Sequence, residues 1–339
     1  MSDFLPEDNA REQDGQPAVD PAPGQEPGPD VETARVITGS PLAAVMASQA
    51  STTPPDESEI APAPKLPPLR PNLLHTLLFF FIAFVMLLLG QLIAAVVYQL
   101  LTLGTQAHLS LSAAYQITAS DPRLSIPTQA AIYGALVMLA VIVFSGLWLS
   151  PFWETLEWRA SRARRFFFPL LLVGLLTGVA IGALGNSLPM PMPKNPPILH
   201  EMSTSTLGAW FLLVFGITAA PMTEELAFRG FLLPSLLNIF KWLERRGVSN
   251  AQVTRWIGIP VSILLTTIPF TLLHAEQVSD SWGPLVLIGV VSVVLCVVRL
   301  SMKSVACGAV VHAAYNFTLF AGVVYQTSGF QHLNKLMGS

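Results

Sequence analysis

The sequence predicts an all-α, polytopic membrane protein with about seven transmembrane helices, seven or eight in all, behind a disordered N-terminal tail. Two observations predict this fold class. Of the 339 residues, 52% are hydrophobic and only 12% are charged, and the mean hydropathy is +0.56, which is the composition of a membrane protein. In addition, apolar runs of membrane-spanning length recur from residue 73 to residue 325.

The first 64 residues differ in composition from the rest of the chain. They hold 12 of the 21 acidic residues but 2 of the 18 basic ones, and they are rich in proline. Such a segment cannot bury enough apolar surface to offset the entropy lost on ordering, so we expect a disordered cytoplasmic tail. No cleavable signal peptide is visible in it. The remainder holds 9 acidic and 16 basic residues, a net charge of +7.

Each span follows from an apolar run between polar segments. The fourth run, 207–241, is about 50 Å long as a helix and exceeds the bilayer core, so it is either steeply tilted or broken near Pro221. A further re-entrant element is an alternative within 102–129 or 187–206. The chain then divides into the tail (1–64), N-terminal transmembrane helices (65–206), a catalytic membrane core (207–325) and a short C-terminal tail (326–339). The expected spans are 73–101, 130–149, 166–185, 207–241, 256–274, 284–298 and 305–325.

Basic residues alternate between the loops and predict an orientation. They gather before the first span and after the second, fourth and sixth, and the last of these groups is Arg299 with Lys303. The positive-inside rule therefore places the N-terminus in the cytoplasm, in an integral multi-pass protein of the plasma or inner membrane of a prokaryote. No basic cluster with interleaved aromatic residues indicates a nucleic-acid partner. Cys296 and Cys307 lie in apolar runs and are expected to be small buried residues.

Three charged side chains interrupt the apolar run 207–241. Glu225 and Arg229 are four residues apart, in the favoured order for an ion pair on one helix face, whereas Glu224 is turned about 100° away. Ionisable groups at membrane depth cost free energy and persist where they pair or face a wet cavity. We therefore expect a functional site here, with Glu224 as the freer carboxylate; the alternative is one structural cluster at a helix end.

Two later spans repeat the pattern of polar side chains four residues apart. Phe270 shares a helix face with His274, and His312 shares one with Asn316. A carboxylate beside a histidine can activate water and return the proton to a leaving amine, while a second histidine and an amide can donate to an oxyanion. The set therefore indicates amide hydrolysis. Alternatively Glu224, His274 and His312 hold a divalent metal such as zinc, although asparagine is an uncommon zinc ligand.

Other intramembrane protease designs lack their residues. The sequence contains no H-E-x-x-H motif, no aspartate within a span and no G-x-S-x-G turn, which excludes the helical zincin, paired-aspartate and nucleophile-elbow arrangements.

The motifs resemble those of a known family. EELAFR (224–229), FTLLH (270–274) and HAAYN (312–316) match E-E-x-x-x-R, F-x-x-x-H and H-x-x-x-N of the CPBP family, the type II CAAX-protease and bacteriocin-processing (Abi) intramembrane proteases. The resemblance covers roughly residues 207–325. It implies an intramembrane endopeptidase, often classed as a metalloprotease. Glu224 and His274 would activate water and His312 and Asn316 would stabilise the oxyanion, with Glu225 and Arg229 as supports.

The resemblance also implies a partner class, a peptide or protein substrate in or near the lipid bilayer, which is prenylated for the eukaryotic members. The same polar groups could instead relay protons in a transporter or belong to a non-catalytic membrane scaffold. No internal repeat typical of transporters is visible.

Helix lengths set one geometric condition on this site. Counted from Lys241 and Arg255, Glu224 and His274 lie roughly 25–28 Å deep, whereas His312, counted from Lys303, lies about 14 Å deep. Straight helices would keep them apart. A separation of more than about 10 Å between His312 and the other two would contradict the site.

Overall fold

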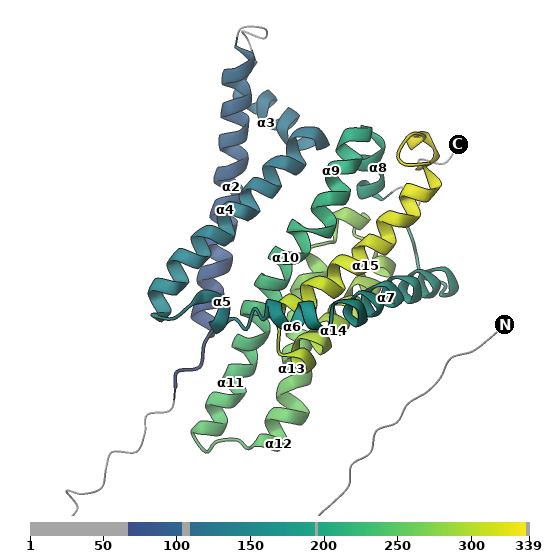
Figure 1. Cartoon of the computed structure of the whole chain (residues 1–339). Helices are drawn as coiled ribbons and strands as arrows, with labels where there is room; N and C mark the ends of the chain where they lie inside the picture. The colour runs from purple at the N-terminus through teal and green to yellow at the C-terminus, as the bar shows by residue number, and fades with distance from the viewer. Residues whose placement is uncertain (1–66, 104–108, 194–195, 337–339) are drawn as a thin grey trace, which may run out of the picture. The chain divides into compact units, whose positions relative to one another are not determined.

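The computed structural model describes residues 67–103, 109–193 and 196–336, and all regular elements in these ranges are helices (Figure 1). The expected tail at 1–64 lies outside the described residues. Seven helical stretches are long and apolar enough to cross a membrane, which confirms the all-α fold of an integral multi-pass membrane protein. They are Leu73–Thr102, Pro122–Trp148, Phe167–Ser187, Thr206–Arg245, Ala251–Leu272, Trp282–Met302 and Val305–Gln326.

The helices in chain order include several short ones between the spans. They are α2 (Leu73–Thr102), α3 (Leu111–Ser120), α4 (Pro122–Trp148), α5 (Phe152–Thr155), α6 (Ala160–Arg165), α7 (Phe167–Ser187), α8 (Pro197–Ser203), α9 (Thr206–Ile217), α10 (Ala219–Glu225), η2 (Leu226–Leu232), α11 (Leu233–Arg245), α12 (Ala251–Val253), η3 (Thr254–Gly258), α13 (Ile259–Leu272), η4 (Glu276–Val278), α14 (Trp282–Met302), α15 (Val305–Gln326) and η5 (Leu333–Leu336).

The segments 102–129 and 187–206, in which the sequence allowed an eighth element, each hold a short helix. α3 has 10 residues and α8 has 7, so neither is long enough to cross a bilayer, which takes about 20 residues. The sixth span is longer than the sequence predicted, because α14 continues to Met302. Arg299, expected in a loop, therefore lies inside a helix and is buried.

The long fourth run is broken close to the proline, which is one of the two alternatives that the sequence left open. α9 ends at Ile217, and Thr218 has non-helical backbone angles (φ −126°, ψ −84°) before α10 begins. Pro221 is the third residue of α10. Its missing N–H could not bond to the Ile217 carbonyl, so the chain tolerates the proline only in the first turn of a new helix.

A π-helical stretch, η2, follows α10 and carries Arg229. Such stretches are rare, and within α-helices they frequently occur at functional sites. All but the last of its seven residues are buried, and its phenylalanines pack with α2, α4 and α5 in the main apolar core. The π-helical stretch is thus held in place by packing against α2, α4 and α5.

Helix α15 approaches α7 closely because α7 has two glycines four residues apart. A β-carbon on Gly174 would stand 2.4 Å from the carbonyl oxygen of Val311, and one on Gly178 would stand 2.6 Å from the Thr318 side chain. Small residues at this spacing let two membrane helices pack backbone to backbone. The packing fixes the position of α15, which carries the third motif.

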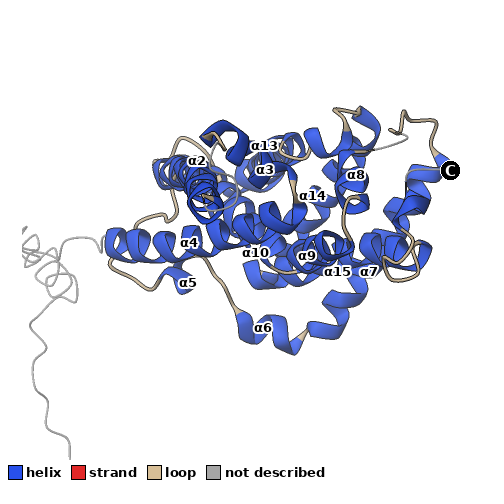
Figure 2. Cartoon of the chain, turned by 90° about the horizontal axis from the view of Figure 1, so that it is seen from above, coloured by secondary structure: helices blue, strands red, loops and turns tan. Residues whose placement is uncertain are grey.

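The helices of the motifs lie at the centre of the bundle. α9 and α10 lie between α4 on one side and α15 with α7 on the other (Figure 2). α13 and α14 pack against each other, and α14 also contacts α15. The chain after α15 folds back, because Phe330 is fully buried and its carbonyl accepts a hydrogen bond from Thr206 Oγ1 at the start of α9.

Candidate active site

The structure brings the glutamate and both histidines of the three motifs together. Nε2 of His274 and Nε2 of His312 each lie 3.8 Å from the same atom, Oε2 of Glu224. The three side chains come from α10, from the turn after α13 and from α15. The condition set by the helix lengths is met, since these distances are far below 10 Å.

The depth difference expected from the sequence rested on straight α-helices between the basic residues and the motifs. The structure has a π-helical stretch in both counted segments, η2 between Glu224 and Lys241 and η3 at Arg255. Lys241 and Lys303 line one hollow, so it is the assumption of straight helices that does not hold. His274 lies two residues past the end of α13, but its ring stays beside that of Phe270, with the centroids 4.9 Å apart, as the four-residue spacing predicted.

The tautomer of each histidine follows from the partner of its Nδ1 atom. Nδ1 of His274 lies 2.8 Å from the carbonyl oxygen of Phe270, and Nδ1 of His312 lies 3.2 Å from Oε1 of Glu225. Both partners only accept hydrogen bonds, so each Nδ1 carries the proton and donates it. Both Nε2 atoms are therefore left with a lone pair, on the side that faces Glu224.

Exposure separates the two glutamates in the way that helix geometry predicted. The side chain of Glu224 is 15% exposed and that of His274 is 18% exposed, whereas that of Glu225 is fully buried. Glu225 Oε1 accepts a hydrogen bond from Arg229 at 2.8 Å. Glu224 Oε2 is buried and has no hydrogen-bond partner among the described residues. Glu224 is thus the carboxylate available for chemistry.

The buried Arg229 joins α14 to this site. Its second terminal nitrogen donates to the carbonyl oxygen of Ser292 at 3.0 Å and to the hydroxyl of Ser292 at 2.8 Å. The guanidinium lies over the ring of Phe270, 4.4 Å from its centroid. The backbone carbonyl of Arg229 accepts from Arg299 Nε at 3.1 Å, and Arg299 in turn pairs with Glu157 at 2.9 Å. A buried charge is tolerated when it is paired and hydrogen-bonded in this way.

Phe270 also orients the histidines. Its ring centroid lies 4.9 Å from that of His274 and 5.9 Å from that of His312, the second pair in an edge-to-face arrangement. The Phe270 side chain is 1% exposed. It therefore forms an apolar wall between the two imidazoles and the Arg229 guanidinium.

Asn316 lies one helical turn beyond His312 and contacts the helix break. Its Nδ2 donates to the carbonyl oxygen of Gly216 at 2.7 Å. This carbonyl belongs to the last turn of α9, where backbone acceptors lose their helical partners. The amide therefore caps α9 with one N–H and has a second N–H available.

Three further residues of the site were not expected from the sequence. Ser292 is a small polar residue in an apolar run, and the position of Arg299 is typical of a basic loop residue. Nothing in the sequence therefore predicts that either residue contacts Arg229. Gly308 allows the close approach of Glu225, because a β-carbon there would stand 2.5 Å from Glu225 Oε2. Its only signal is that it lies four residues before His312 on the same helix face.

Two imidazoles and one carboxylate are the ligand types that zinc takes. As arranged, they do not fit a metal ion: in the part of the chain that the structure describes, no group of three or more His, Cys, Asp or Glu side chains could hold one. The 3.8 Å separations are also wider than the roughly 3.4 Å expected between two ligands of a tetrahedral zinc with bonds of about 2.1 Å.

Two hollows elsewhere in the structure are not lined by Glu224, His274 or His312. One, of about 560 Å³, lies between α6 and the end of α14. The other, of about 280 Å³, lies between α11 and α14 and is lined in part by Glu157 and Arg299.

Comparison with known proteins gives one match. Residues 206–318, a third of the chain, match a family model described as type II CAAX prenyl endopeptidase Rce1-like. The match includes all three motifs and agrees with the resemblance found in the sequence. Neither a curated protein nor a solved structure matches the chain.

Proposed function

We propose that this chain, whose residues 206–318 match the family model of the type II CAAX prenyl endopeptidase Rce1-like proteins, hydrolyses a peptide bond near the C-terminus of a membrane-associated substrate. The family supports intramembrane endopeptidase activity in general. The substrate and the role of each residue are our proposal: Glu224 and His274 activate water, and His312 and Asn316 stabilise the oxyanion.

The observation that carries the proposal is the convergence of three acceptors on one point. Glu224 Oε2 and the Nε2 atoms of His274 and His312 face each other at 3.8 Å. This is too long for direct hydrogen bonds, and none of the three atoms brings a proton when Glu224 is ionised. A water molecule between these atoms would donate its two protons to two of the three acceptors and so satisfy them.

Water bound there is placed for general-base catalysis. Glu224, as the partly exposed carboxylate, accepts a proton from the water while the oxygen attacks the substrate carbonyl carbon. His274 accepts the second hydrogen bond and keeps the oxygen lone pair directed at the carbonyl. The proton then passes to the leaving amine, as general acid–base catalysis requires.

The oxyanion that forms on the carbonyl needs donors. His312 becomes a donor when its Nε2 takes up a further proton from solvent, in addition to the one that Glu224 passes to the amine, and the Glu225 carboxylate at Nδ1 stabilises the resulting imidazolium, as the aspartate does in a Ser-His-Asp triad. Asn316 offers its second amide N–H. Each such donor contributes on the order of 10²–10³ to kcat.

Arg229 supports this reaction without contacting substrate. It fixes Glu225 by a buried ion pair, so that Glu225 can hold the His312 ring in one orientation. Ser292 and Arg299 hold Arg229 and the π-helical backbone in turn. These residues position the catalytic groups.

The proposal also covers the orientation in the membrane, the substrate class and the metal. The basic loops place the N-terminus in the cytoplasm by the positive-inside rule, and the substrate class includes prenylated peptides. In the alternative form of the mechanism, Glu224, His274 and His312 would hold a zinc ion, which would require them to move closer together than the 3.8 Å separations of this structure.

The test uses the purified full chain in detergent and a quenched, prenylated peptide library. Wild type is compared with Glu224→Ala and His274→Ala, each with and without a chelator, and with His200→Ala as a control outside the site. We expect cleavage by wild type and by the control, and its loss in both site variants. Inhibition by the chelator would select the zinc form. Cleavage that survives in both site variants would contradict the proposed roles.

A further inference from the structure

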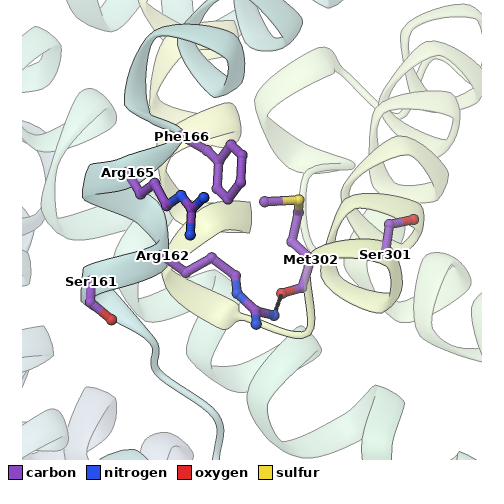
Figure 3. Close-up of a pocket in the computed structure, with 6 residues that line it drawn as sticks. All are labelled: Ser161, Arg162, Arg165, Phe166, Ser301 and Met302. Atoms are coloured by element: carbon purple, nitrogen blue, oxygen red, sulfur yellow. Dashed lines mark hydrogen bonds between the residues drawn. The ribbon is translucent and has the colours of Figure 1, made fainter. Parts of the chain in front are cut away.

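The hollow between α6 and α14 combines positive charge with apolar surface. It is lined by Ser161, Arg162, Arg165, Phe166, Ser301 and Met302 (Figure 3). No acidic residue lines it. Neither arginine forms an ion pair with a carboxylate within residues 67–103, 109–193 and 196–336. The positive charge in the hollow is therefore not neutralised by the protein.

The two arginines differ in what they contact. Arg162 donates from Nη1 to the backbone carbonyl of Met302 at 2.5 Å, which joins α6 to the end of α14. Arg165 lies with its guanidinium 5.4 Å from the ring centroid of Phe166 and has no hydrogen bond to the described residues. Figure 3 shows both guanidinium groups beside the space that Met302 closes. Arg162 is fixed, and Arg165 is available to a ligand.

The chemistry of this lining selects a phosphate group. Guanidinium groups offer paired N–H donors that match phosphate oxygens, and hydroxyl groups add single donors. Ser161 and Ser301 line the two sides of the hollow, with their hydroxyl oxygens directed away from the arginines (Figure 3), so the two guanidinium groups are the main donors. Its volume of about 560 Å³ is within the range of small-molecule sites, so a headgroup larger than phosphate alone can enter.

The surroundings favour a lipid as the source of the phosphate. Span α7 begins directly after α6 with Phe167 and Phe168, which are 44% and 77% exposed. The hollow therefore lies where a basic segment meets the first apolar turn of a membrane span. Basic pockets between membrane helices at such a boundary bind anionic headgroups.

We propose that this hollow is a binding site for the phosphate headgroup of an anionic phospholipid, held by Arg162 and Arg165 with the acyl chains along the phenylalanines of α7. The site is separate from the three motifs. It connects α6 to the turn between α14 and α15, which the chain already fixes by the hydrogen bond from the Val305 N–H to the Glu157 carbonyl at 3.2 Å.

The test counts lipids bound to the purified full chain by native mass spectrometry in detergent, during titration with phosphatidylglycerol or phosphatidylcholine. Arg165→Gln removes the available guanidinium of the hollow. Arg164→Gln is the matched control, because Arg164 is an exposed neighbour on the same helix that does not line the hollow. Both sites are exposed, so both variants should fold, and thermal unfolding confirms this.

We expect the first phosphatidylglycerol to bind wild type more tightly than phosphatidylcholine does. Arg165→Gln should weaken this binding about five-fold, the change expected for one basic side chain beside an anionic lipid, and Arg164→Gln by less than about two-fold. Equal effects of the two variants, or equal binding of the two lipids, would show general surface attraction and overturn the proposal. Displacement by inorganic phosphate at equal concentration would assign the hollow to the free ion instead.

Discussion

Glu225 and Gly308 are in such close contact that no β-carbon fits between them. The position of a β-carbon on Gly308 is 2.5 Å from Glu225 Oε2, and the same carboxylate is held by Arg229 and His312 through its other oxygen. The carboxylate therefore cannot move aside without breaking one of these contacts.

The contact predicts the effect of a single methyl group. Gly308→Ala should displace the Glu225 carboxylate and with it the His312 ring. A misplacement of about 1 Å costs on the order of 10²-fold in rate. Gly322→Ala on the same helix is the control, because nothing lies within 4 Å of its β-carbon position. The peptide-cleavage assay decides: a Gly308→Ala protein as active as Gly322→Ala would show that the Glu225–His312 geometry is irrelevant to the reaction.

Removal of Arg229 should destabilise the fold. Arg229→Ala leaves the fully buried Glu225 carboxylate without its cation, a change that costs about 3–5 kcal/mol. Thermal unfolding in detergent measures it, with the exposed Arg164→Ala as a control that should leave Tm nearly unchanged. An unchanged Tm for Arg229→Ala would refute the structural role of the pair.

A double variant at Glu225 and Arg229 separates the effect of the ion pair on stability from its effect on catalysis. Replacing a buried ion pair by apolar residues of similar volume is often neutral or stabilising. Glu225→Leu with Arg229→Met should therefore unfold at a higher temperature than Arg229→Ala but remain inactive, because His312 loses its acceptor. Recovery of cleavage together with stability would contradict the positioning role of Glu225.

Asn316 has two functions in this account, and one variant measures both. Asn316→Ala leaves the Gly216 carbonyl without its donor, which costs about 1–3 kcal/mol. It also removes an oxyanion donor, which should lower kcat by about 10²–10³-fold. Rates are compared well below the Tm of the variant. A lower Tm with wild-type kcat would leave Asn316 only the capping of α9.

Part of the site could be predicted from the sequence because it depends on local spacing. The Glu225–Arg229 pair is made within one helical stretch, so its four-residue separation was sufficient to predict it. The break near Pro221 followed from the missing N–H of proline, and the all-α membrane fold followed from the length of the apolar runs. These predictions need no information about which helices are neighbours.

The remaining features depend on tertiary contacts. Ser292 and Arg299 bind Arg229 because α14 packs beside the π-helical stretch, and no spacing rule gives that neighbour. The depth count failed because it assumed straight α-helices, whereas π-helical stretches lie within the counted segments. Arg299 was expected in a loop because a basic residue after an apolar run resembles a span end. Burial and two partners keep it in the helix instead.

The most direct measurement of the central claim compares two glutamates near His274. Glu224 lies 3.8 Å from its ring, and Glu276 lies two residues after it in the chain. Glu224→Gln keeps the shape of the side chain but removes the base, whereas Glu276→Gln makes the same change on an exposed residue of η4. Steady-state cleavage of the prenylated peptide by each variant gives kcat and KM. The account predicts that Glu224→Gln lowers kcat by at least 10²-fold with little change in KM, and that Glu276→Gln cleaves like wild type. Equal activity of the two variants would contradict the assignment of Glu224 as the group that activates water.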